Sequence, residues 1–119
     1  MKAEINNAPK RPKYNEGDVF WMSVGENVGF EEEGKGALFA RPILIVKGFS
    51  RELCWGVPLT SQGKSGEYYY PLRIKGKVSV AILSQMKVID LSRISGKRMG
   101  IVGDKSLWAI KKRLQSFLK

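Results

Sequence analysis

The sequence predicts a mainly β fold, in which a small, strongly curved antiparallel sheet or barrel precedes a single C-terminal α-helix. Three observations support this prediction: short apolar runs between turn residues from Gly17 onwards, 13 glycines, and only one stretch with helical periodicity, near the end of the chain. Several short strands cannot bury both faces in a flat sheet, so we expect the sheet to curve. The 119 residues suffice for one domain, which we place at residues 17–119.

The first half of the chain supplies a tail and two strands. Residues 1–16 are polar, contain two prolines and show no periodicity, so we expect a flexible tail. Residues 18–24 form the first expected strand, and a long connection with several glycines, residues 26–40, follows it. Residues 41–48 contain the continuous apolar run ILIV, which is typical of a strand covered on both faces. We therefore place this strand at the centre of the sheet.

The next segments supply further strands, two of them containing proline. Residues 52–61 form a strand in which Pro58 marks an end, a bulge or an edge position. Residues 67–77 form a strand that Pro71 interrupts. Residues 79–90 are the longest apolar run and form either one bent strand or two consecutive strands.

The end of the chain combines a weak strand, KRMGIVG, with the expected helix. Asp104 is expected to cap a helix that runs to about Leu118. Apolar residues recur within it at spacings of three and four, which places them on one face of the helix. They are Leu107, Ile110, Leu114 and Phe117.

Positive charge is concentrated in the second half of the sequence. Residues 1–60 carry eight Lys or Arg and eight Asp or Glu, whereas residues 61–119 carry thirteen and three, a formal net charge of +10. An excess of this size indicates a surface that attracts a polyanion, either a nucleic acid or an acidic protein segment. The alternative is a basic surface that only keeps the protein in solution.

The composition excludes several kinds of chemistry. Histidine is absent, which removes the commonest metal ligand and the commonest general base, and with them triads and zinc sites of the usual kind. Cys54 is the only cysteine, so no intramolecular disulfide forms. No apolar run suits a membrane span or a signal peptide, and we expect a cytoplasmic protein. The three glutamates at residues 31–33 are interpreted as solvated, so we expect no metal and no cofactor.

Two strand ends carry polar side chains that suit chemistry on a phosphate. Arg41 precedes Pro42, which favours an extended backbone there, and its guanidinium can bind a phosphate or pair with a nearby carboxylate. Thr60 and Ser61 end another apolar strand with two hydroxyl groups. These can serve a reaction or simply satisfy the backbone of a turn, and the residue types alone leave both alternatives open.

The aromatic residues also allow two interpretations. Tyr68 and Tyr70 would share one side of an extended strand, where they either stack on bases or pack in a core. The three tryptophans are Trp21, Trp55 and Trp108. They are expected in the core more often than at an interface, so they indicate dimerisation only weakly.

The order of these segments resembles the PemK/MazF family of toxin endoribonucleases, the toxins of type II toxin–antitoxin pairs. The resemblance rests on GDVFWMSV, VGFEEEG, RPILIV, VPLTSQ and SVAILSQMKVID, in this order and before a closing amphipathic helix. It implies an SH3-like β-barrel with a C-terminal helix, a homodimer, and cleavage of single-stranded RNA at short sequence motifs without a metal. It also implies an antitoxin that blocks the active groove with an extended, largely acidic segment.

The resemblance assigns roles to individual residues. The catalytic arginine of the RP motif corresponds to Arg41, and the catalytic threonine or serine of the PLTS motif corresponds to Thr60. The RNA-binding loop corresponds to residues 28–33, which GKGALFA separates from Arg41, so this loop is longer and more acidic than the family pattern. Further candidates are Ser61, Gln85 and Glu31 as catalytic support, and Phe30, Lys64, Arg73, Lys75, Lys77 and Lys87 as RNA contacts.

Such a reaction needs few protein groups because RNA supplies its own nucleophile, the ribose 2′-hydroxyl. A guanidinium and a hydroxyl in one groove can hold the phosphodiester in line and stabilise the pentacoordinate phosphorane. The products would be a 2′,3′-cyclic phosphate and a 5′-hydroxyl. Arginine stays protonated at ordinary pH, so Glu31 or a neighbouring glutamate is a candidate proton acceptor.

Two other functions fit the charge and the aromatic residues. One is a noncatalytic SH3-like or OB-like nucleic-acid-binding module. The other is a scaffold that binds an acidic protein segment and has lost activity. Gln85 likewise has two interpretations, since it either reaches a base or forms structural hydrogen bonds.

Overall fold

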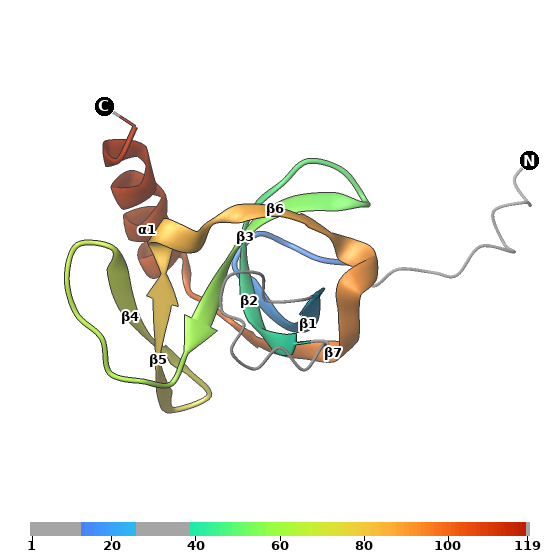
Figure 1. Ribbon diagram of the computed structural model, residues 1–119, viewed down its shortest axis with the longest axis horizontal. Coiled ribbons are helices and arrows are strands. Elements are labelled where there is room, and N and C mark those ends of the chain that lie inside the picture. The colour runs from blue at the N-terminus through green and yellow to red at the C-terminus, as the bar shows by residue number, and fades with distance from the viewer. Residues whose placement is uncertain (1–12, 26–38, 119) are drawn as a thin grey trace, which may run out of the picture.

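The computed structural model describes residues 13–25 and 39–118, which form a curled antiparallel sheet with one α-helix against it (Figure 1). In chain order the elements are β1 (Asp18–Gly25), β2 (Phe39–Gly48), β3 (Leu53–Thr60), β4 (Tyr69–Ile74), β5 (Lys77–Ile82), the 3-10 helix η3 (Leu83–Gln85), β6 (Lys87–Asp90), the 3-10 helix η4 (Leu91–Arg93), β7 (Ile94–Ile101) and α1 (Asp104–Ser116). The expected mainly β fold with a C-terminal helix is confirmed.

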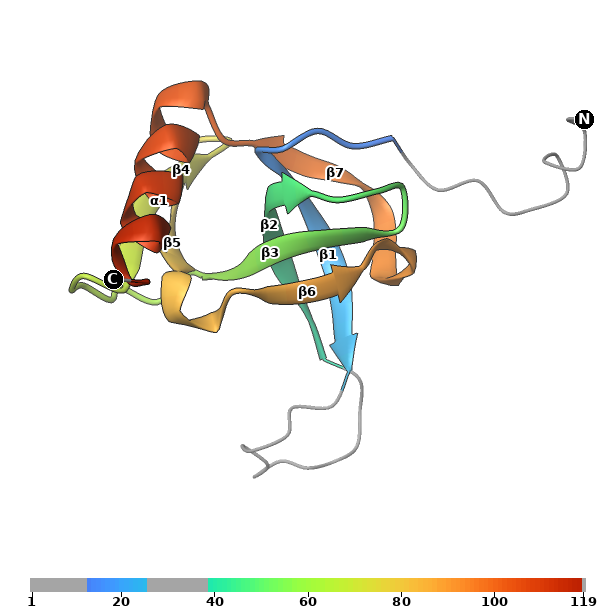
Figure 2. The same ribbon diagram turned by 90° about the horizontal axis from the view of Figure 1, so that it is seen from above.

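Six strands lie side by side in the order β4–β5–β3–β2–β1–β7, and β6 pairs with β3. Residues Leu53 to Gly56 of β3 pair with β6, whereas Leu59 and Thr60 pair with β5. The apolar run at residues 79–90 is therefore two strands, separated by η3. Pro58 lies where β3 changes its partner, which agrees with the irregularity expected there. Figure 2 shows the resulting curl, with β4, β5 and α1 gathered at one end.

The strand β2 lies between β1 and β3 and is covered on both faces, as its apolar run predicts. It begins two residues earlier than expected, at Phe39. Because successive side chains alternate between faces, Leu44 and Val46 enter one core while Ile43 and Ile45 enter the other. Each fully buried side chain of this size stabilises the fold by about 1.5–3 kcal/mol.

Two buried cores therefore flank the sheet. The helix-side core contains Val19, Leu44, Val46, Val57, Leu59, Leu72, Ile74, Ala81, Leu83, Val102, Leu107 and Ile110. The second core contains Phe20, Met22, Ile43, Ile45, Cys54, Ile89 and Leu91. Leu114 and Phe117 also pack against the helix-side core, so the expected apolar stripe of α1 is confirmed.

The outer strands β4 and β7 approach each other where Ile74 meets Gly100. A Cβ atom added at Gly100 would lie 2.5 Å from Cγ2 of Ile74. Since no real Cβ atom tolerates that distance, only glycine lets β7 come this close to β4. This contact helps to close the curl into a barrel-like shape.

Three local expectations are wrong. Pro71 does not interrupt β4, since this strand lies at the edge of the sheet and Pro71 stays in register opposite Val80. Asp104 is the first residue of α1, and its side chain makes no capping hydrogen bond, because Gly103 occupies the cap position. The tryptophans are not core residues, and their exposed fractions are 41% for Trp21, 38% for Trp55 and 63% for Trp108.

Of the expected tail, residues 1–12 lie outside the described residues, but its last residues contact the domain. The Tyr14 hydroxyl donates a hydrogen bond of 2.6 Å to a carbonyl in the β2–β3 turn. The Glu16 carboxylate lies 2.6 Å from the Lys111 ammonium group of α1 and also accepts a bond from the N–H of Gly48. These contacts tie the entry to β1 to both the sheet and the helix. Within residues 13–25 and 39–118, no helix is long and apolar enough to cross a membrane.

Candidate active site

The register of the sheet places Arg41 and Thr60 on the same face. Arg41 lies opposite Met22 of β1, and Ile43 lies opposite Pro58 of β3. Because the strands are antiparallel, two further residues along each one would set Arg41 opposite Thr60. Directly opposite residues share a face, so both side chains lie on the face of the second core, beyond its apolar end.

The strands diverge at this point. The pairing of β2 with β3 ends at Ile43 and Pro58, and β3 continues towards β5, where Thr60 lies opposite Val80 (Figure 2). Both Arg41 and Thr60 are partly buried. A partly exposed guanidinium can bind a phosphate through its planar fork of donors.

The Thr60 hydroxyl is held by the backbone that follows it. Its Oγ1 accepts a hydrogen bond of 3.1 Å from the N–H of Gln62. This bond is the turn-satisfying alternative expected from the sequence, but it also fixes the hydroxyl oxygen. With one lone pair occupied, the O–H remains available as a donor.

The other predicted catalytic residues that the structure describes are both exposed. Ser61 is exposed in the bend directly after β3, and Gln85 is exposed at the end of η3. Neither has a hydrogen bond among those described. Phe30 and Glu31 lie outside the described residues, so their predicted roles stay predictions.

The predicted RNA-contacting cations fall into two groups. Arg73 of β4 lies opposite Val78, two residues from the Pro71–Val80 pair, and alternation puts it on the face of Thr60. Its Nη1 atom donates to the carbonyl of Gly76, 3.3 Å away, in the β4–β5 turn. In this turn Lys75 has a φ of +52°. The remaining cations, all exposed, are Lys77 at the start of β5, Lys87 at the start of β6 and Lys64 in the β3–β4 connection.

Sequence reasoning missed Val78, whose side chain is 55% exposed on the same face as Arg73 and Thr60. The sequence carries no signal of this exposure, because Val78 alternates in step with the buried Val80; burial instead rises steadily along β5 from the β4–β5 turn. An exposed apolar side chain between basic groups can contact a base or a ribose. It therefore extends the candidate site along β5.

The tyrosines pack against the helix. The rings of Tyr68 and Phe117 lie 4.8 Å apart, and the Arg113 guanidinium lies 5.5 Å from the ring of Tyr70. Packing rather than base stacking is therefore the interpretation that these contacts favour.

The cysteine and the acidic groups offer little alternative chemistry. Burial raises the pKa of the Cys54 thiol to about 11, so the thiolate nucleophile is scarce at neutral pH. Among residues 13–25 and 39–118, no three Cys, Asp or Glu side chains are arranged to hold a metal ion. Among the predicted catalytic residues that the structure describes, Arg41 and Thr60 are the two that the strand register puts on one sheet face.

Comparison with known proteins finds one matching family model. Residues 15–118 match the model of the PemK-like, MazF-like toxin of type II toxin–antitoxin systems. No match was found among curated protein sequences.

Solved structures show the same fold at low sequence identity. MazF from Deinococcus radiodurans is 20% identical, with a TM-score of 0.67 over 92% of this chain and 98% of that one. An endoribonuclease from a mycobacterial species is 15% identical, with a TM-score of 0.66 over 91% and 93% of the two chains. A mycobacterial endoribonuclease in complex with its cognate antitoxin is 18% identical, with a TM-score of 0.63 over 93% and 95%.

Proposed function

The chain belongs to the family of PemK-like, MazF-like toxins of type II toxin–antitoxin systems, and on this premise we propose that it cleaves single-stranded RNA without a metal ion. The observation that carries the proposal is the register that puts Arg41 and Thr60 on one sheet face at diverging strand ends. Structures of related fold include endoribonucleases, which supports the same activity.

In the proposed reaction, the ribose 2′-oxygen attacks the adjacent phosphorus and the bond to the 5′-oxygen of the next nucleotide breaks. The Arg41 guanidinium donates to the non-bridging oxygens, where negative charge grows in the phosphorane. The Thr60 hydroxyl donates to the same phosphate and helps to hold it in line. The leaving 5′-oxygen takes up a proton from water, so that a 2′,3′-cyclic phosphate and a 5′-hydroxyl result.

Proton transfer is assigned to groups other than Arg41, because arginine stays protonated. We propose that Glu31 or one of the two glutamates after it accepts the 2′-hydroxyl proton. Replacing each with glutamine and recording cleavage rate against pH tests this role. If one variant no longer shows the fall in cleavage rate at acidic pH, the glutamate replaced in it is the base. Three unchanged profiles would exclude all three glutamates as the base.

The decisive experiment incubates the purified protein with a long unstructured RNA in EDTA. We expect discrete cuts at a short motif, with cyclic phosphate and 5′-hydroxyl ends. Retention of the RNA on the protein without cuts would instead indicate a noncatalytic nucleic-acid-binding module. Cuts that EDTA abolishes would exclude the metal-independent mechanism.

We also propose a cytoplasmic antitoxin partner and a homodimer. Related structures include MazE–MazF complexes from Deinococcus radiodurans and a mycobacterial endoribonuclease with its antitoxin. The half-exposed tryptophans Trp21 and Trp55 leave apolar surface that a second copy could cover. Sedimentation equilibrium of the purified chain would test the dimer, because a monomer at micromolar concentration contradicts it.

A further inference from the structure

A second arginine lies at the end of the sheet that bears Arg41. Met22 of β1 lies opposite Arg41 of β2 and also opposite Ile94, the first residue of β7. Because directly opposite residues share a face, these three side chains form a row across the sheet, on the face of the second core. Arg93, the last residue of η4, directly precedes Ile94. The row therefore leads from Arg41 over two strand spacings, about 10 Å, to the backbone next to Arg93.

The side chain of Arg93 is placed by a contact with β1. Its Nη1 atom donates to the carbonyl of Ser23, 3.4 Å away. Ser23 follows Met22 and lies opposite Ala40, the residue before Arg41. This long bond uses one of the five N–H donors of the guanidinium, and the group is exposed, so further donors can bind a ligand.

The backbone that carries Arg93 is fixed at several points. The side chain of Asp90 accepts a hydrogen bond of 2.9 Å from the N–H of Ser92. The N–H of Leu91 donates to the carbonyl of Glu52, at 2.8 Å, and the Leu91 side chain is buried in the second core. A cation on a backbone that is already ordered loses less entropy on binding than one on a flexible loop.

The charge of Arg93 is not used by an ion pair in the described part of the chain. The ion pairs found there join Arg98 to Asp18 and Lys111 to Glu16. An exposed guanidinium without such a partner can bind a phosphate through charge-assisted hydrogen bonds. Its surroundings therefore suit a phosphate.

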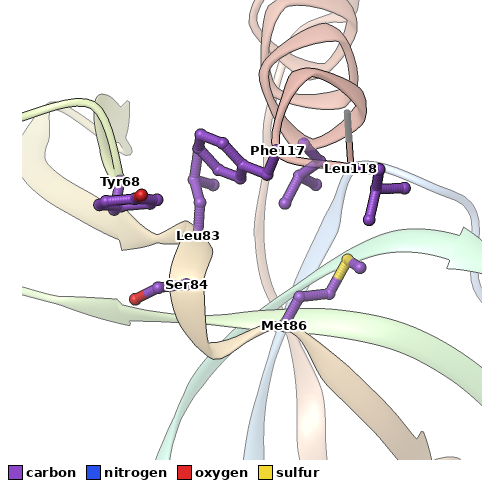
Figure 3. A pocket seen from close by; sticks show the side chains of 7 residues that line it. Tyr68, Leu83, Ser84, Met86, Phe117 and Leu118 are labelled. Atoms are coloured by element: carbon purple, nitrogen blue, oxygen red, sulfur yellow. The ribbon is translucent and has the colours of Figure 1, made fainter.

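The helix end of the sheet offers a phosphate less. A hollow of about 260 Å³ lies there between η3 and the C-terminal end of α1 (Figure 3). Its lining side chains carry no charge at neutral pH, so an RNA backbone gains no electrostatic attraction from them. They belong to Tyr68, Leu83, Ser84, Met86, Leu114, Phe117 and Leu118.

We propose that Arg93 binds the phosphate next to the scissile linkage, on the β1 side of Arg41. The inference rests on the proposed function, in which Arg41 and Thr60 hold the scissile phosphate. Thr60 lies on the β3 side of Arg41, whereas Arg93 is held at the carbonyl of Ser23. A phosphate between Arg41 and Thr60 thus lies away from Arg93, and the next phosphate of the strand reaches it. An RNA strand bound in this way crosses the sheet from β3 over β2 and β1 to η4.

The test uses a single-stranded RNA whose 2′-hydroxyl groups are methylated, so that it binds without being cleaved. Filter binding at several salt concentrations gives the slope of log affinity against log salt. We expect Arg93→Gln to reduce this slope by about 0.7 and to weaken binding about tenfold. Arg93→Lys keeps the charge and should retain the slope. Arg51→Gln removes the same charge from the β2–β3 turn, at the other end of these strands, and should change neither quantity.

Cleavage of an unmodified RNA gives a second readout. We expect Arg93→Gln to raise KM about tenfold and to leave kcat unchanged, because a neighbouring phosphate is held equally in the ground state and the transition state. A merely structural role would lower the thermal unfolding temperature and leave the salt slope as it is. Arg93→Ala repeats both measurements with a second neutral side chain, in case Arg93→Gln folds poorly.

Three results would overturn the proposal. The first is an unchanged salt slope in both neutral variants, which would leave the bond to Ser23 as the role of this side chain. The second is an equal fall of the slope in Arg51→Gln, which would show a general effect of net charge. The third is a fall in kcat at constant KM, which would place Arg93 at the scissile phosphate. The methylated RNA requires no cleavage, so an inactive chain would defeat the proposed function and leave the salt slope to decide on Arg93.

Discussion

The two faces of the central strands differ in what lies at their ends. On the helix side, α1 covers the core, and its contacts extend through Leu107 and Ile110 to Phe117. On the other side, the second core stops at Met22 and Ile43, and Arg41 follows on the same face. On this face, therefore, residues of β2 pack in the core as far as Ile43, and the candidate catalytic residue Arg41 lies beyond the end of that core.

This difference separates two kinds of mutational effect. Changes at Arg41 and Thr60, beyond the end of the second core, should alter RNA cleavage and leave the fold stable, because these side chains reach the surface. Changes at the contacts that hold α1 should alter stability and leave cleavage of folded protein unchanged.

The largest effect is expected for Arg41→Ala. Removing one preorganised donor to the transition state costs about 10²–10³-fold in rate. We expect kcat/KM on a short fluorogenic RNA to fall by this factor while the thermal unfolding temperature stays within a few degrees. Arg41→Lys is the matched control, since it keeps the charge but loses the planar fork, and it should give an intermediate rate. Cleavage by Arg41→Ala at the unmodified rate would remove Arg41 from the mechanism.

A smaller effect is expected for Thr60→Val, which keeps the shape and removes the hydroxyl. The side chain can then neither accept from the Gln62 N–H nor donate to the phosphate. We expect a loss of about a hundredfold in kcat/KM, at the lower end of the range for one donor. Thr60→Ser retains both bonds and should cleave within a few-fold of the unmodified protein. A loss in Thr60→Ser with full activity in Thr60→Val would point to packing of the methyl group instead.

The sequence predicts the elements well because their signals are local. The run from Ile43 to Val46 indicates a strand buried on both faces, and the spacing from Leu107 to Phe117 indicates one buried helical stripe. Both predictions are confirmed by the burial of these side chains. Local patterns suffice here because each strand or stripe carries its own periodicity.

The sequence could not predict features that depend on distant partners. Pro71 does not interrupt its strand, because β4 lies at the edge of the sheet. Only the order of all the strands shows that β4 has this position. The tryptophans look like core residues, but the two cores of the described residues consist of other apolar side chains, mostly aliphatic ones. The candidate site behaves likewise, since the motifs name Arg41 and Thr60 while only the strand register puts them on one face.

The basic residues of the β4–β5 hairpin should have a moderate and additive effect on binding. Arg73 shares the face of Thr60, Lys75 lies in the turn that follows β4, and Lys77 is the first residue of β5. If each contacts a phosphate, each change to glutamine should reduce the slope of log affinity against log salt by about 0.7. Filter binding of single-stranded RNA at several salt concentrations measures this slope. Lys105→Gln, on the far side of the sheet in α1, should leave it unchanged.

The smallest effect is expected for Glu16→Gln, which weakens the link between the entry to β1 and α1. The hydrogen bond from Lys111 lowers the pKa of Glu16 below its ordinary value of 4.5. A lowered pKa in the folded state means that the carboxylate stabilises the protein above pH 4.5 and that this contribution is lost as the pH falls through the lowered value. Because both side chains are about one-third exposed, the loss at pH 7 should be no more than about 1 kcal/mol.

Urea denaturation at pH 7 and at pH 3 measures this contribution for Glu16→Gln and for the unmodified chain. The difference in unfolding free energy should be present at pH 7 and smaller at pH 3, with RNA cleavage at neutral pH unaffected. Glu52→Gln, an exposed position in the β2–β3 turn, is the control and should match the unmodified chain at both values. A loss of cleavage in folded Glu16→Gln would show that the helix side also positions the candidate active site, and the separation of the two faces would fail.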